Sequence, residues 1–286
     1  MSDGVETEYD LRTTAELVDL INRREATVPS AVRIAAPAII RVVDSVVERL
    51  ARGGRLIYVG AGSSGRLAEL DASECVTTFG VDEVVAVVAG GLTASPLDAA
   101  AAEDDKHAGA ADLRELAPTE NDVVVGVSAS GSTPYVSGAL ETARAAGSHT
   151  VALACKVGSY HALLADEAIE VAVGPEFLSG STRLKAGTAQ KLVLNTISTV
   201  AMIRLGRAYG NLMVGAAPAN DKLRARLHDV VAAATGAPDD EVEQALEAAG
   251  GDGRVAVVAL LAGVDAETAA ARLRSARGNV RKAATS

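Results

Sequence analysis

Residues 60–65, GAGSSG, form a glycine-hydroxyl turn between an apolar run and a helical stretch. The backbone N–H groups of such a turn, that of Gly62 among them, can hold a phosphate group together with the hydroxyls of Ser63 and Ser64. Glu74 lies farther along the same helical stretch and could donate or accept a proton. This pattern indicates a catalytic site for a small phosphorylated molecule.

The same turn matches the dinucleotide pattern G-x-G-x-x-G, which leaves two other interpretations open. Nicotinamide binding calls for an acidic residue about 20 residues farther on, at the tip of the second strand. The run at residues 84–91, VVAVVAGG, ends without one. The turn could also be purely structural and let a helix pack against a strand. The two serines favour phosphate over both alternatives.

A second hydroxyl-rich turn, SASGSTP, covers residues 128–134 and also follows an apolar run. Pro134 suits the first position of a helix, and helix N-termini attract anions. Ordinary N-capping would also explain the hydroxyls. The candidate ligands are Ser128, Ser130, Ser132 and Thr133. Two such turns at one edge of a sheet predict a sugar-phosphate site.

A third polar segment, SGSTRLKAGTAQK at residues 179–191, precedes and opens a long helical stretch. Capping and solvation explain part of its composition. Apolar residues resume at Leu192, so the segment adjoins a buried helix and could face the ligand. It adds Ser181, Thr182 and Lys185 to the candidate ligands.

Other acids and histidines give weaker signals. Asp71 shares a helix face with Glu74, and Glu103 begins an acidic triplet that, by itself, is typical of a solvated helix. The 4 histidines show no metal-ligand spacing. We therefore expect neither a metal nor a cofactor.

The composition excludes several classes of partner. A net charge of −10, 2% aromatic residues and no tryptophan disfavour a nucleic acid. An acidic protein that binds a phosphorylated metabolite must build a local positive site against its overall charge.

No apolar run approaches the ~20 residues of a membrane span, and the start, MSDGVETEYD, lacks an apolar signal core. With only two distant cysteines, Cys75 and Cys155, we expect a cytoplasmic protein.

Strands and helices alternate through the middle of the chain. The five runs RLIYVG, VVAVVAG, DVVVGVSA, HTVALAC and AIEVAVG lack polar alternation, as is typical of strands buried on both faces. Helical stretches fall at about 30–52, 64–76, 97–116, 134–146, 158–166 and 185–207. This order predicts an α/β fold of three layers, α/β/α, with a parallel sheet whose ligands bind beyond the carboxyl ends of the strands. We expect an N-terminal helical segment at 1–54, a sugar-phosphate domain at 55–215 and a small helical domain at 216–286.

Four long segments resemble the N-acetylmuramic acid 6-phosphate etherases of the sugar isomerase (SIS) superfamily. They are GAGSSGRLAELDASEC, GVSASGSTPYVSGALE, GSTRLKAGTAQKLVLN and YGNLMV. The resemblance extends over nearly the whole chain. It implies a five-stranded SIS domain with a UBA-like helical appendage, and a lyase that removes D-lactate from N-acetylmuramate 6-phosphate to leave N-acetylglucosamine 6-phosphate. It also implies a homodimer whose site lies at the subunit interface.

The resemblance assigns the two catalytic acids of the family to Glu74 and Glu103. We expect Glu74 to protonate the departing lactate and Glu103 to act as the base at C2. The sequence departs from the family pattern at Ser132, where an arginine is usual, and at Ala100, where a glutamate is frequent. Ser63 replaces a threonine and keeps its hydroxyl.

Two other functions remain open at this point. One is a sugar-phosphate isomerase of the same superfamily, and the other is a non-catalytic sugar-phosphate sensor, such as the glucokinase regulatory protein. The sensor is much longer and contains two SIS modules, whereas this chain has one. An isomerase gives no reason to retain both acids.

Overall fold

The computed structural model describes residues 8–216 and 221–286. Most of the acidic start, and the Ala217-Pro218 step at the expected domain boundary, lie outside the described residues.

A five-stranded parallel sheet forms the centre of the larger part of the molecule, as the sequence predicts. Its strands are β1 (Leu56–Gly60), β2 (Val84–Val88), β3 (Val123–Ser128), β4 (His149–Ala154) and β5 (Glu167–Glu170). Their spatial order is β2-β1-β3-β4-β5, so the chain winds in one direction from β1 to β2 and in the other from β3 onwards. In the register of the sheet, Gly60 at the end of β1 pairs with Val88 and with Val127. The ends of β1 and β3 therefore meet where the order reverses, which is where open α/β sheets bind ligands.

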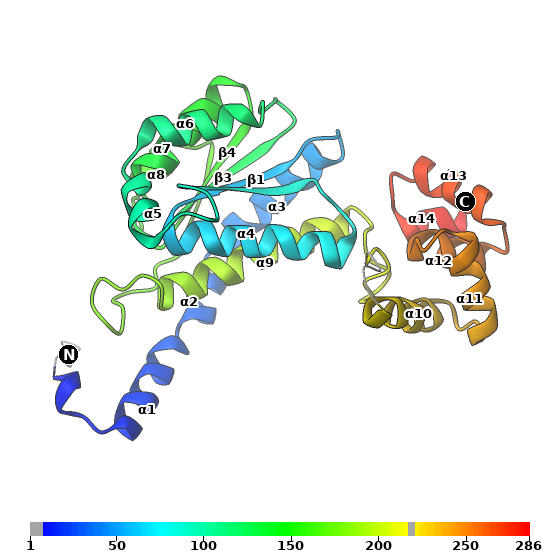
Figure 1. The fold of residues 1–286 in the computed structure, drawn as a ribbon, viewed down its shortest axis with the longest axis horizontal. Helices are drawn as coiled ribbons and strands as arrows, with labels where there is room; N and C mark the ends of the chain where they lie inside the picture. Colours follow the sequence, from blue (N-terminus) through cyan, green and yellow to red (C-terminus); the bar gives the residue numbers. More distant parts are fainter. Residues whose placement is uncertain (1–7, 217–220) are drawn as a thin grey trace.

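Helices cover both faces of the sheet (Figure 1). One face is covered by α3 (Ala36–Leu50), α4 (Gly62–Phe79) and α9 (Lys185–Arg204). The other is covered by α6 (Lys106–Glu115), α7 (Pro134–Ala145) and α8 (Tyr160–Leu164). The short α5 (Pro96–Glu103) contacts both α4 and α7. The chain opens with a 3-10 turn (Tyr9–Leu11), α1 (Thr14–Glu25) and α2 (Val28–Ile34).

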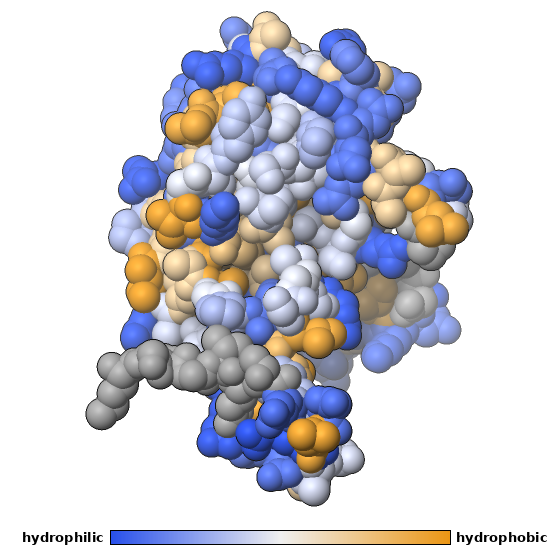
Figure 2. Space-filling model, turned by 90° about the vertical axis from the view of Figure 1, so that its left-hand side faces the viewer, coloured by the Kyte–Doolittle hydropathy of each residue, from blue (hydrophilic) through white to orange (hydrophobic). Residues whose placement is uncertain are grey.

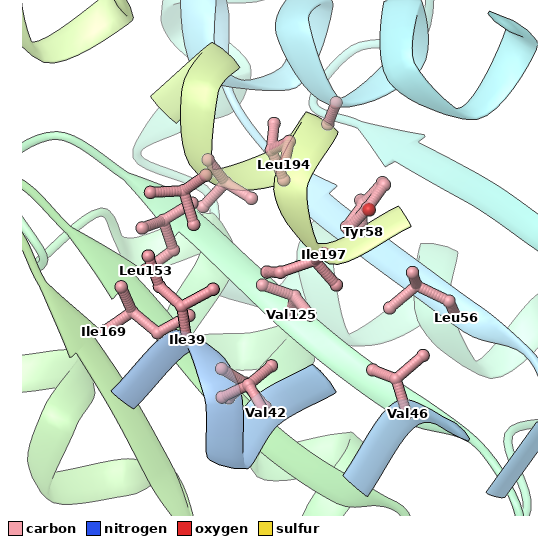
Figure 3. Packing of buried hydrophobic residues seen from close by; sticks show 14 of the residues in the cluster. Ile39, Val42, Val46, Leu56, Tyr58, Val125, Leu153, Ile169, Leu194 and Ile197 are labelled. Carbon is pink, nitrogen blue, oxygen red and sulfur yellow. The ribbon is translucent and has the colours of Figure 1, made fainter. Parts of the chain in front are cut away.

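Alternate residues of each strand enter two different cores. Leu56, Tyr58 and Val125 face α3 and α9, where they meet Val42, Ile197 and their neighbours (Figure 3). Ile57, Val59 and Val124 face α6 and α7. Every residue of β1 and β3 is buried, which explains why these runs carry no polar alternation.

Two helices expected to be continuous are each divided in the structure. The stretch 30–52 is broken between α2 and α3 at Ala35, because Pro37 has no N–H to continue the hydrogen-bond ladder. The stretch 97–116 is broken between α5 and α6. Asp105 is extended there, and its carboxylate accepts hydrogen bonds from the N–H groups of His107 and Ala108, which starts a new helix.

Short helices make up the end of the chain, as expected. They are α10 (Asp221–Thr235), α11 (Asp239–Ala248), α12 (Gly253–Ala262), α13 (Ala266–Ser275) and α14 (Val280–Thr285). They enclose a separate apolar core that includes Val231, Val242 and Val257, and Val214 of the preceding loop joins it. In Figure 1 they lie to one side of the sheet. Within the described residues, no helix has the length and apolarity needed to cross a membrane.

Candidate functional site

A polar cavity of about 340 Å³ lies beyond the carboxyl ends of β1 and β3. The lining residues are Ala61, Gly62, Ser63, Ser64, Glu103, Ser128, Ala129, Ser130, Thr133 and Thr182. The structure thus brings together residues from both hydroxyl-rich turns and from the third polar segment. Figure 2 faces the side on which α5, α7 and α8 lie in Figure 1. It shows residues of intermediate hydropathy in the middle, with hydrophobic residues in separate patches.

The N-terminus of α4 forms one wall of the cavity. No side chain caps this end of the helix, so its first N–H groups are available to an anion. Gly62 has a φ of 53°, which favours glycine. At Gly65, a Cβ atom would lie 2.6 Å from the Gly60 carbonyl oxygen, so only glycine lets α4 start this close to the sheet. The sequence pattern alone could not separate this packing role from phosphate binding, and the turn has the geometry for both.

A chain of hydroxyl groups crosses the opposite wall. Ser132 Oγ donates to Ser130 Oγ at 3.2 Å, which lies 3.2 Å from Ser128 Oγ. Ser128 Oγ lies 2.8 Å from Thr133 Oγ1, and Thr133 Oγ1 donates to Glu103 Oε1 at 3.4 Å. An ionised carboxylate can only accept hydrogen bonds. When Glu103 is charged, each hydroxyl of the series must therefore donate to the next one toward Glu103.

Glu103 is the acidic residue that lines the cavity. It is the last residue of α5 and is half-buried. A Cβ atom on Gly62 would lie 3.9 Å from Glu103 Oε2, so the carboxylate faces the N-terminal turn of α4 as well as the hydroxyl chain. The cavity therefore combines donors for an anion with one group that can take up a proton.

Gln190 supports the cavity from behind and was not a candidate from the sequence. Its Oε1 accepts a hydrogen bond of 3.0 Å from Ser64 Oγ, and the side chain is buried in α9. Its Nε2 has no partner within the described part of the chain. The only sequence signal was its place in the polar segment 179–191.

His161 holds the second turn in the same way. Its buried Nε2 donates to the Thr133 carbonyl at 3.1 Å and lies 3.1 Å from Ser137 Oγ. Nδ1 has no partner among the described residues. Burial is the main cause that lowers the pKa of His161 below its ordinary 6.5. No sequence pattern connects this histidine to the turn, because the two come together only through the packing of α8.

Acidification is expected to destabilise the protein through His161. The folded state binds a proton at this side chain more weakly than the unfolded state does. The neutral His161 therefore contributes stability above pH 6.5, and this contribution falls as the pH drops below that value. Urea unfolding of the wild type and of His161→Asn between pH 5 and pH 8 measures this. The variant should show a smaller loss of stability toward low pH, whereas His107→Asn, at an exposed histidine of α6, should keep the full loss. Equal slopes in all three proteins would contradict this expectation.

Three candidate ligands lie outside the cavity lining. Ser132 is exposed and takes part only through Ser130, and Ser181 is half-buried nearby. Lys185 is buried, and its Nζ donates to the Pro175 carbonyl at 3.4 Å. Glu176 accepts hydrogen bonds from the N–H groups of Lys185 and Ala186 at 2.8 and 3.0 Å, so a carboxylate already caps α9.

Glu74 does not line this cavity within one chain. It lies three turns along α4, with a side chain 52% exposed, and its Oε2 is 2.9 Å from Lys191 Nζ of α9. Asp71 on the same helix is buried and accepts hydrogen bonds from Tyr58, Asn195 and Ser198. Asp71 therefore ties α4 to β1 and α9, whereas Glu74 faces outward.

The cavity has no basic side chain in its lining. An anion bound there would depend on N–H groups and hydroxyls, which supply hydrogen bonds without a net charge. Within residues 8–216 and 221–286, no three histidine, cysteine or acidic side chains are grouped so that they could hold a metal ion.

Two family models match the chain. The N-terminal SIS domain of the glucokinase regulatory protein matches residues 38–144, and the SIS domain matches residues 108–199. Curated relatives match far more of the chain than either family model. Proteins from Streptomyces avermitilis and Rubrobacter xylanophilus are each 54% identical over 278 residues, which is 96% of this chain and 89% and 92% of theirs. A relative from Mycolicibacterium smegmatis is 48% identical over 97% of this chain and 94% of its own. All three are named N-acetylmuramic acid 6-phosphate etherase.

Solved structures share the fold at low identity. A phosphoheptose isomerase from Neisseria gonorrhoeae has a TM-score of 0.53 and 21% identity, covering 66% of this chain and 98% of its own. One from Francisella tularensis has a TM-score of 0.51 and 19% identity, covering 65% and 98%. These similarities show the fold alone.

Proposed function

Because this chain belongs to the family of N-acetylmuramic acid 6-phosphate etherases, we propose that it cleaves the lactyl ether of N-acetylmuramate 6-phosphate. The products are D-lactate and N-acetylglucosamine 6-phosphate, which makes the protein a carbon–oxygen lyase of amino-sugar recycling. The observation that carries the proposal is the cavity at the ends of β1 and β3, where anion-binding turns face the carboxylate of Glu103.

The phosphate of the substrate is proposed to bind at the two turns. The N–H groups that open α4 and the hydroxyls of Ser63 and Ser64 supply donors from one side. Ser128, Ser130 and Thr133 supply hydroxyls from the other, and Thr182 closes the rim. Ser132 would act on the ligand through Ser130, with which it forms a hydrogen bond. The proposal also retains Ser181, which precedes Thr182 in the chain, and Lys185, which opens α9.

Elimination accounts for how two carboxyl groups can cleave an ether at neutral pH. In the ring-opened sugar, C1 is an aldehyde and the proton on C2 becomes acidic. Glu103 removes that proton, the bond from C3 to the lactyl oxygen breaks, and a proton from Glu74 completes D-lactate. Water then adds at C3 and a proton returns to C2. Each proton transfer is worth about 10²–10⁴-fold in rate.

Glu103 is suited to the part of the base. The hydroxyl chain from Ser130 through Ser128 and Thr133 can end on a charged carboxylate with every donor used. These hydrogen-bonded hydroxyls also position the carboxylate oxygen relative to the phosphate-binding turn. This position beside the phosphate-binding turn supports Glu103 as the base at C2.

A homodimer would bring the second acid to the cavity. The exposed side of α4 runs from Ser63, at the cavity, to Glu74, which is eleven residues and about 17 Å farther along the helix. If a two-fold axis packs this helix antiparallel to its copy, Glu74 of one protomer approaches the cavity of the other.

The surface beside Glu74 has the composition of such an interface. Large apolar side chains on α4 and α9 are exposed there, namely Leu70, Val76, Leu192, Val200 and Ile203. In addition, α1 buries none of its residues against its own chain and extends away from the body in Figure 1. A second copy would cover both features.

The proposed division of the chain and its location complete this assignment. The proposed boundaries are 1–54 for the N-terminal helical segment, 55–215 for the sugar-phosphate domain and 216–286 for the helical domain. The separate core around Val231 and Val257 supports the last of these. A cytoplasmic location agrees with two free thiols, Cys75 and Cys155, and with burial that raises the pKa of each to about 12, so that neither is reactive.

Release of D-lactate tests the activity directly. The purified protein is incubated with N-acetylmuramate 6-phosphate, and D-lactate is measured with a coupled dehydrogenase. We expect stoichiometric lactate and N-acetylglucosamine 6-phosphate. Tight binding of the substrate without lactate release, from folded protein at high concentration, would instead identify a sugar-phosphate sensor. Conversion of an aldose phosphate to a ketose phosphate would identify an isomerase.

A further inference from the structure

A second cavity, of about 380 Å³, lies far from the catalytic one, where the C-terminal helices meet the end of α9. Its charged lining residues are Arg207, Asp252, Arg254, Arg274 and Arg277. Arg207 lies three residues beyond the end of α9, whereas the others belong to α12, α13 and the turns next to them. In Figure 1 these helices lie beside the sheet domain, so the cavity is at the junction of the two parts.

Two of the four arginines already have acid partners. Arg207 Nη2 lies 3.1 Å from Glu83 Oε1, which precedes β2. Arg254 donates to both oxygens of Asp252, at 3.1 and 2.8 Å, while Asp252 also caps α12. A guanidinium has five N–H donors, so both arginines keep donors for another group.

The other two arginines have no acid partner within the described residues. Arg274 and Arg277 are exposed, line the same cavity and form no ion pair there. Arg277 also has a φ of 54°, a left-handed conformation that is uncommon for a residue other than glycine. The cavity therefore concentrates positive charge on a protein whose net charge is −10.

The backbone is closely packed on the side of the cavity where Arg207 lies. Gly206 lies against Asn279, where a Cβ atom would be 2.4 Å from the Asn279 Cα. At Gly278, with a φ of 82°, a Cβ atom would lie 3.4 Å from Arg207 Nη1, so the absence of a side chain makes room for this guanidinium. Val255 and Leu273 add an apolar wall.

We propose that this arginine cavity binds a small phosphate-bearing anion at a site separate from the catalytic cavity. Planar guanidinium groups match the geometry of phosphate oxygens and bind them with paired hydrogen bonds. The two unpaired charges of Arg274 and Arg277 balance a dianion, and the volume is suitable for a small metabolite. Because Arg207 is anchored to the sheet domain and the other arginines to the C-terminal helices, the bound anion links the two parts.

Equilibrium dialysis of radiolabelled inorganic phosphate against the full-length protein tests this proposal. It is run at constant ionic strength in chloride, and glycerol 3-phosphate as competitor tells whether the site takes the ester as well as the free ion. We expect two classes of bound phosphate in the wild type. Arg274→Gln/Arg277→Gln should lose one class, with binding weakened by about tenfold or more. Ser128→Ala/Thr133→Ala should lose the other, and Arg272→Gln, at an arginine of α13 outside the cavity, should lose neither.

The same variants contradict the proposal if phosphate binding does not depend on the arginines. Unchanged stoichiometry and Kd of phosphate binding in Arg274→Gln/Arg277→Gln would overturn the proposal. It would also be overturned if an equal concentration of chloride abolished the second class of phosphate binding. A change of mass in solution without a change in phosphate binding would show that the arginines contact another copy instead. If the double variant loses helical signal, Arg274→Gln alone decides, with Arg274→Lys expected to restore part of the binding. Lactate release should stay unchanged in Arg274→Gln/Arg277→Gln, so that failure here leaves the etherase assignment standing.

Discussion

Glu103→Gln is expected to lower kcat for D-lactate release by about 10²–10⁴-fold, because glutamine cannot take the proton from C2. The fold should survive the change. Glu103 is half-buried at the end of α5, and it accepts a long hydrogen bond of 3.4 Å from Thr133 Oγ1. Initial rates of lactate release, together with circular dichroism of the variant, measure both expectations. Asp104→Asn, at the exposed neighbour of Glu103, is the matched control and should retain activity.

Exchange at C2 separates the roles of the two glutamates. In deuterium oxide, Glu74→Gln should still incorporate deuterium at C2 of the amino sugar while releasing little lactate, because proton removal precedes departure of the ether oxygen. Glu103→Gln should incorporate none. The reverse pattern would exchange the two roles. Normal lactate release by Glu103→Gln would remove it from catalysis altogether.

Mixing two inactive variants is expected to restore activity if each site takes its acids from two chains. Glu74→Gln and Glu103→Gln are co-refolded so that their subunits combine at random. Each mixed dimer then contains one cavity with an intact Glu103 and an intact Glu74 from the other chain. About half of the dimers are mixed and each has one complete site, so the rate should reach about one quarter of the wild type.

The geometry of α4 is the reason to expect this result. Glu74 is separated from its own cavity by three helical turns, and its helix α4 and the neighbouring α9 both carry exposed apolar residues, such as Leu70 and Leu192. Each variant refolded alone is the control for residual activity. A mixture as inactive as its parents, with dimers present by light scattering, would show that both acids act within one chain. A fully active Glu74→Gln would instead remove Glu74 from the mechanism.

The sequence by itself determined the sheet and the two turns that line the cavity. Short uninterrupted runs such as LIYVG and VVVGVS, rich in β-branched residues, are typical of strands with helices on both sides, since an exposed face would need polar residues. In a parallel sheet, whatever follows the strands gathers at one edge. Ser63, Ser64, Ser128 and Thr133 were therefore predicted to lie together, and they line one cavity.

Only the tertiary structure decided which distant residues complete or support the cavities. Glu103, which only the family resemblance singled out, belongs to an acidic triplet that looks solvated by residue type, and the packing of α5 against α4 and α7 brings it to the hydroxyl groups of the second turn. Gln190 and His161 reach the same turns through α9 and α8, and the arginine cavity unites residues 207 and 254 with α13. Such contacts depend on how whole elements pack against one another. The secondary-structure propensities of neighbouring residues do not indicate that packing, because the contacts join segments that are distant in the chain.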